Sequence, residues 1–225
     1  MTHAAATVDQ MRPPYPAERG LDVYNTKLGM WVFLASEVMF FAALIGTYVI
    51  LRFGATGEWA KPGIVLNIKI TAFNTFLLIC SSVSMVKAYA AIQDGDPKKM
   101  RFWLLMTILG GAAFVGIQVF EYIHLVEHGF TPAGVREGSE LAGLVANGTL
   151  PAATMGLYGS TFFTMTGFHG FHVTCGVISM AYLYVTKALP GKYSQQDYRG
   201  IETVGLYWHF VDLVWIILFT IVYLI

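Results

Sequence analysis

Three pairs of ionisable residues stand three positions apart inside apolar segments of the sequence. The pairs are Glu121 with His124, His169 with His172, and His209 with Asp212. A spacing of three places both members of a pair on one face of a helix. Glu-x-x-His and His-x-x-His motifs on neighbouring helices are what a carboxylate-bridged metal site in a helical bundle would use. A stand-alone di-metal enzyme, such as a hydroxylase, is therefore the first hypothesis to weigh.

The depths of these pairs argue against a shared metal. Counted along their helix from Arg101, Glu121 and His124 fall about 30 Å away, at the far surface of a membrane. His172 lies well inside the membrane instead, so the two motifs do not converge. Only six histidines are present, and too few of them are deep for such a centre. We therefore predict that no residue of this chain ligates a metal, and that Glu121 and His169 are structural polar groups.

Glu37 is an acidic residue deep inside the first apolar segment. It lies ten residues beyond Lys27, which places it about 15 Å into the membrane. A charged carboxylate there costs on the order of 3 kcal/mol, and the flanking Phe33, Phe40 and Phe41 favour the neutral acid. We expect Glu37 to bond a hydroxyl or a histidine on a neighbouring helix rather than a cation. Glu37 is thus a functional candidate, and the structural alternative is a neutral acid that only ties helices together.

Polar residues on other segments fall at a depth similar to that of Glu37. We predict that they form one polar layer inside the bundle, made of Ser81, Ser82, His172, His209 and Asp212. Because His209 and Asp212 share a helix face, a direct bond between them would satisfy both without a metal.

Five apolar stretches carry these residues, and each is long enough to cross a bilayer core of about 30 Å. They are residues 27–51, 64–92, 102–125, 157–186 and 201–225. With 56% hydrophobic and 12% charged residues, the chain has too little polar surface for a soluble globule of 225 residues. We predict an all-α integral membrane bundle of five transmembrane helices over residues 27–225, preceded by a cytoplasmic N-terminal segment over residues 1–26.

The connections and small residues refine this arrangement. Residues 127–155 form the only long connection, and their Gly, Pro and acidic content predicts a surface excursion rather than a second domain. Small residues four positions apart predict places where helices approach closely in lipid. These pairs are Ala42 with Gly46, Ala112 with Gly116, and Gly170 with Thr174.

The distribution of basic residues predicts the orientation. Ten of the 14 Lys and Arg residues fall on the side of the N-terminus and four on the other side. Because positive residues favour the cytoplasmic side, the N-terminus is expected in the cytoplasm and the C-terminus outside. The 14 acidic residues balance the 14 basic ones, so nothing favours a nucleic-acid partner.

Several motifs resemble one family of membrane proteins, in order and spacing, along nearly the whole chain from Lys27 onward. They are KLGMWVFLASEVMFF at 27–41, YGSTFF at 158–163, TGFHGFHV at 166–173 and YWHFVDLVW at 207–215. Weaker matches occur at Gly95-Asp96 with Lys98-Lys99-Met100, and at Gln118 with Glu121-Tyr122. On these motifs the chain is identified as similar to subunit III of the haem-copper terminal oxidases (cytochrome c oxidase), in its bacterial five-helix form.

The resemblance implies a non-redox subunit of a proton-pumping respiratory enzyme in the bacterial cytoplasmic membrane. Haem and copper would be held by partner subunits, and this chain would bind neither. The implied partners are the catalytic oxidase subunit I, the other oxidase subunits, membrane lipids including structural phospholipids, and a respiratory supercomplex. The residue matching Glu37 reacts with carbodiimide in the family and is associated with proton uptake and oxygen access.

The chain departs from the mitochondrial members of the family in two ways. It lacks the first two of their seven helices, so the lipid-filled cleft that those helices form does not carry over intact. Its connection over residues 127–155 is also longer than the mitochondrial one.

Other hypotheses stay open beside this one. A subunit III-like component of a quinol oxidase or of a nitric oxide reductase would share the same motifs. The stand-alone di-metal enzyme is disfavoured by the small number of deep histidines. A channel or transporter would be expected to have broken or charged helices, whereas no Pro lies within any of the five stretches.

Overall fold

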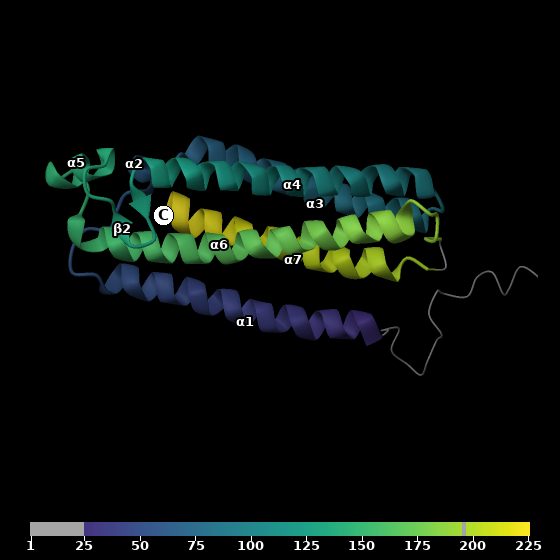
Figure 1. Ribbon diagram of the computed structural model, residues 1–225. Helices are drawn as coiled ribbons and strands as arrows, with labels where there is room; N and C mark the ends of the chain where they lie inside the picture. The colour runs from purple at the N-terminus through teal and green to yellow at the C-terminus, as the bar shows by residue number, and fades with distance from the viewer. Residues whose placement is uncertain (1–24, 195–196) are drawn as a thin grey trace, which may run out of the picture.

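The computed structural model describes residues 25–194 and 197–225, and it is a bundle of long helices lying side by side (Figure 1). The predicted N-terminal segment, residues 1–26, therefore lies almost wholly outside the described residues. The long helices are α1 (Asn25–Gly54), α3 (Ile68–Gln93), α4 (Pro97–Glu127), α6 (Ala152–Leu183) and α7 (Arg199–Phe219). Short π-helical turns, η2 (Tyr184–Ala188) and η3 (Thr220–Leu224), continue α6 and α7. The predicted all-α membrane fold is confirmed.

Four of these helices are long and apolar enough to cross a membrane within the part of the chain that the structure describes: α1, α3, α4, and α7 with η3. The fourth predicted stretch, now α6, is 32 residues long but is rich in Gly, Thr and His. These residues lower its hydropathy, and twelve of its residues are buried within the fold. The count of five transmembrane helices stays a prediction.

The second predicted stretch was wrong at its start. Residues 64–92 are not one helix, because a short helix α2 (Pro62–Val65) ends before α3 begins. The Leu66 amide donates to the Pro62 carbonyl at 2.7 Å and closes α2. The Asn67 side chain then accepts from the Ile70 amide at 3.3 Å, which is the N-cap that starts a new helix.

The third predicted stretch began too late. Helix α4 starts at Pro97 rather than at residue 102, because Asp96 accepts from the amides of Lys98 and Lys99 at 3.1 and 3.0 Å. Proline in the first turn lacks only an amide that would be unpaired there. The Lys99 amide and ammonium stabilise the carboxylate and lower the pKa of Asp96. A polar first turn therefore extends the helix beyond its apolar part.

The helices approach one another closely at several glycines, but most of these are not the glycines at which close approach was predicted. A Cβ on Gly111 would lie 2.5 Å from the Trp208 ring and 2.7 Å from Val177, and a Cβ on Gly110 would lie 2.8 Å from Ser81. Positions 46 and 116, by contrast, face open space. Within this chain the predicted close approaches at those two glycines were wrong, because Gly116 is exposed, Gly46 is only partly covered, and no neighbouring atom lies within 4 Å of a Cβ at either position.

The predicted surface excursion over residues 127–155 is folded onto the end of the bundle. It contains a two-stranded antiparallel hairpin, β1 (Phe130–Thr131) and β2 (Gly134–Val135), and a short helix α5 (Glu140–Ala146). Phe130 is fully buried and its ring packs against Tyr158 and Phe162 of α6. The excursion is thus anchored by an aromatic side chain.

Candidate functional site

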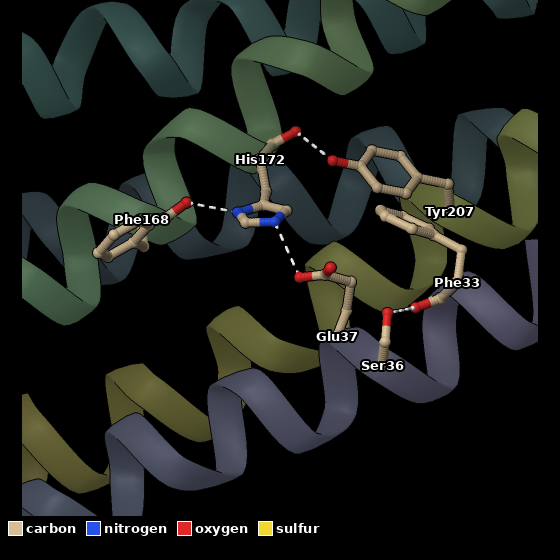
Figure 2. A network of polar contacts seen from close by, with 6 residues as sticks. All are labelled: Phe33, Ser36, Glu37, Phe168, His172 and Tyr207. Carbon is tan, nitrogen blue, oxygen red and sulfur yellow. Dashed lines mark hydrogen bonds and ion pairs between the residues drawn. The ribbon is translucent and has the colours of Figure 1, made fainter.

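The deepest acidic side chain of α1 meets a histidine of α6. Glu37 Oε2 lies 3.1 Å from His172 Nε2, and the two side chains are 16% and 13% exposed. Figure 2 shows the imidazole between this carboxyl and the Phe168 carbonyl, which lies 2.7 Å from His172 Nδ1. The expected bond from Glu37 to a histidine on a neighbouring helix is therefore present, whereas its role stays a prediction.

The geometry limits where protons sit on this pair. The Phe168 carbonyl can only accept, so His172 Nδ1 carries a hydrogen. The short contact between Nε2 and Glu37 then holds one further proton, as either a neutral acid bonded to a neutral imidazole or a carboxylate bonded to an imidazolium. Both states have zero net charge, which suits an apolar environment. The pair is a one-proton site.

Aromatic rings pack against the histidine of the pair. The His172 ring lies edge-on to Phe41 at 5.1 Å and tilted against Phe40 at 6.2 Å between centroids. Tyr207 of α7 donates to the His172 carbonyl at 2.8 Å. Ser36 does not join the pair, because its hydroxyl donates to the Phe33 carbonyl of its own helix at 2.6 Å (Figure 2).

The other residues of the predicted polar layer meet elsewhere. Ser82 of α3 bonds His209 of α7 at 2.7 Å, and the Trp208 indole donates to Ser81 at 3.1 Å. Within the described residues, no hydrogen bond joins these contacts to Glu37 or His172. Glu37 and His172 therefore form a contact between α1 and α6, whereas Ser81, Ser82 and His209 take part in separate contacts between α3 and α7.

The suggested bond between His209 and Asp212 is absent from the hydrogen bonds of the described chain. His209 uses Ser82 instead, and Asp212 Oδ1 is buried without a hydrogen-bond partner. A shared helix face makes the pairing possible, but the imidazole turns toward α3, which packs against α7 at this depth.

The two predicted structural polar groups lie in the core. Glu121 accepts from Thr71 of α3 at 2.8 Å. His169 is fully buried, and its Nε2 lies 3.1 Å from the Val211 carbonyl of α7. Within residues 25–194 and 197–225, no group of three or more His, Cys, Asp or Glu side chains is placed to hold a metal ion.

Sequence reasoning missed a second set of interhelical bonds. Gln118 of α4 donates to the Thr166 carbonyl at 2.9 Å, and the Tyr122 hydroxyl lies 2.5 Å from the Thr166 hydroxyl. The Trp215 indole donates to Thr75 at 2.9 Å. Hydroxyl and amide residues one helical turn apart, such as Gln118 and Tyr122, were the available signal for such contacts.

Few polar contacts hold α1 to the rest of the bundle. Phe41 and Tyr48 are its buried residues. Beside the Glu37–His172 contact, Lys27 forms an ion pair with Glu202 of α7 at 2.5 Å, and Arg52 donates to the Ile225 carbonyl at 2.6 Å. The candidate site therefore sits at the interface between a peripheral helix and the core.

The fold and the site define a predominantly helical, multi-pass membrane protein with a partly buried carboxyl–histidine pair. The family model described as cytochrome c oxidase subunit III matches residues 18–139 and 147–225. The chain belongs to the cytochrome c oxidase subunit III family.

Curated relatives agree with this assignment. The chain is 35% identical over 197 residues to "Cytochrome c oxidase subunit 3" of Thermostichus vulcanus, covering 88% of this chain and 86% of the relative. It is 35% identical over 228 residues to the protein of the same name in Corynebacterium diphtheriae, with both chains covered completely. It is 31% identical over 225 residues to "Probable quinol oxidase subunit 3" of Staphylococcus saprophyticus, covering 100% of this chain and 97% of the relative.

Proposed function

We propose that this chain is a non-redox accessory subunit of a proton-pumping haem-copper oxidase that reduces oxygen to water in aerobic respiration. In this role it stabilises the catalytic subunit, holds lipids, and supports proton uptake and oxygen access. Membership of the subunit III family supports the accessory role. The one-proton pair formed by Glu37 and His172 is the observation that carries the proposal.

The pair fits proton handling better than redox chemistry. A carboxyl and an imidazole that share one proton can gain or lose it at a single Oε2–Nε2 contact. The Phe40 and Phe41 rings beside His172 limit its access to water, and a state of zero net charge is tolerated at this depth. In this proposal Glu37 and His172 are the pair that handles the proton. The helix contacts around the pair are maintained by the other polar residues predicted from the sequence: Ser81, Ser82, His209, Asp212, Glu121 and His169.

The partners follow from the same proposal. Haem and copper are carried by subunit I and its neighbours, and structural phospholipids fill the surfaces between subunits. Purifying the complex through a tag on this chain should recover a catalytic subunit that mass spectrometry identifies. The chain purified alone should show no haem or metal absorption in its optical spectrum. A chromophore bound to the isolated chain would instead support the stand-alone metal enzyme.

A quinol oxidase subunit is the second candidate. The Staphylococcus saprophyticus relative named as a probable quinol oxidase subunit 3 favours it. A catalytic subunit of the nitric oxide reductase type is the remaining alternative. The catalytic partner recovered in the same purification distinguishes a cytochrome c oxidase, a quinol oxidase and a nitric oxide reductase. Measuring the mass of the intact complex in mild detergent tests its membership of a supercomplex.

Topology gives a separate prediction. We expect the N-terminus in the cytoplasm and the C-terminus outside the bacterial cytoplasmic membrane. If the chain crosses the membrane five times, ten of the 14 basic residues lie on the same side of the membrane as the N-terminus, and basic residues favour the cytoplasmic side. Reporter fusions to Met1 and Ile225 should report opposite sides. The same side for both would require an even number of spans and would contradict the five-span arrangement.

A further inference from the structure

A cavity of about 660 Å³ lies where α5 covers the break between α2 and α3. Figure 1 shows α2 and α5 at the same end of the bundle, beside the end of α4. We call it the insertion cavity, because residues 140, 141 and 144 of the long connection form one of its walls. Its volume lies within the range of small-molecule sites, roughly 300 to 1,000 Å³.

The lining of the insertion cavity is amphipathic. Ile64, Leu125 and Leu144 supply apolar walls, whereas Lys69 and Glu140 bring charges of both signs. Lys69 is exposed and has no ion-pair partner among the described residues. The exposed Lys69 ammonium and the Glu140 carboxylate, whose Oε2 lies 3.9 Å from His128 Nε2, together complement a ligand that also carries both charges.

A second carboxyl lies deeper in the same cavity. Glu121 is 8% exposed and accepts from Thr71 at 2.8 Å, and it also lines the cavity. A buried carboxyl with further acceptor capacity favours a ligand group that donates hydrogen bonds. His124 stands on the rim one turn beyond Glu121 and can meet a phosphate.

The surface next to the cavity is apolar. Ile70, Phe73 and Ile123, on α3 and α4, are 40%, 60% and 54% exposed. Apolar side chains this exposed on membrane-crossing helices contact acyl chains, and the ends of such helices lie at the level of the headgroups. The insertion cavity therefore sits where a lipid presents its polar head above its chains.

We propose that the insertion cavity binds a zwitterionic phospholipid with a primary ammonium, of the phosphatidylethanolamine class. Its phosphate lies beside Lys69 and His124, and its ammonium donates to Glu140 and Glu121. A choline headgroup has no N–H to donate to these carboxylates. An anionic headgroup without an amine would face two carboxylates and would therefore bind more weakly. The inference rests on the lipid-holding role proposed above. Because it requires only a bilayer, its failure would leave the proposed assembly with an oxidase untouched.

The test uses the full-length chain in nanodiscs of phosphatidylcholine containing a trace of a photoactivatable phosphatidylethanolamine. After illumination, peptide mass spectrometry should locate the cross-link on segments 63–69, 121–128 or 140–144. Unlabelled phosphatidylethanolamine should displace the probe, and added phosphatidylcholine should not. Lys69→Gln and Glu140→Gln should each lower labelling at these segments about fivefold, the effect of one lost hydrogen bond of about 1 kcal/mol.

Two variants control the experiment. Lys61→Gln removes an exposed lysine of the same region that does not line the cavity, and it should label like the unmodified chain. Leu144→Trp narrows the cavity and should reduce labelling without changing any charge. Equal displacement by phosphatidylcholine, or cross-links spread over all exposed helices, would overturn the proposal. Displacement by soluble phosphoethanolamine would also overturn it, because the ligand would then be a free headgroup and not a lipid.

Discussion

Replacing Glu37 with Gln is expected to leave the assembled oxidase able to start turnover at close to its normal rate, while the number of turnovers before inactivation falls several-fold. The Gln amide can still donate to His172 Nε2, which Glu37 Oε2 now contacts at 3.1 Å. The contact between α1 and α6 therefore survives, so the variant should assemble. What it loses is the carboxyl that can release its proton.

The measurement is oxygen consumption by the whole complex, followed from the first turnover until activity decays. Glu127→Gln is the matched control, because it makes the same chemical change at an exposed carboxyl at the end of α4. Infrared difference spectra should also lose a protonated-carboxyl band in Glu37→Gln, since two separated charges are costly in an apolar site. Immediate and complete loss of activity in an assembled variant would place Glu37 in the chemistry and remove the accessory proposal.

Replacing Gly111 with Ala is expected to destabilise the bundle by about 1–3 kcal/mol, the usual cost of adding atoms to a packed core. The new methyl would lie 2.5 Å from the Trp208 ring and 2.7 Å from Val177. Trp208 is 1% exposed and is held by its bond to Ser81, so it has little room to move. Helices α4, α6 and α7 would have to separate at this point.

Thermal unfolding of the purified chain in detergent, followed by helical circular dichroism, should show a lower midpoint for Gly111→Ala. Gly116→Ala is the control on the same helix, because a Cβ there meets open space. Alanine is also the better helix former by about 1 kcal/mol, so this variant should be as stable as the unmodified chain or slightly more stable. Similar losses in both variants would show that the effect is not steric.

Much of the site was predictable because depth along a helix follows from residue number. The distance of Glu37 and His172 from the segment ends places both in the interior of the membrane. A hydrogen bond between them with zero net charge was one of a few ways to give both side chains a partner. The partner itself was not predictable. Ser81, Ser82 and His209 fall at comparable depth, and only the rotation of each helix about its axis decides which of them Glu37 meets.

By itself, the sequence determined that the chain is helical and membrane-embedded, because backbone amides in lipid must be bonded within each segment and long apolar stretches satisfy this as helices. It also determined that a carboxyl lies deep in the first of them. Only the tertiary structure shows that neighbouring helices pack closely against Gly111 and not against Gly116. It also shows which hydroxyl His209 bonds. The physical reason is that hydropathy specifies which residues enter lipid but is nearly uniform around these helices. Their rotation is therefore set by close packing and interhelical hydrogen bonds, which depend on several segments together.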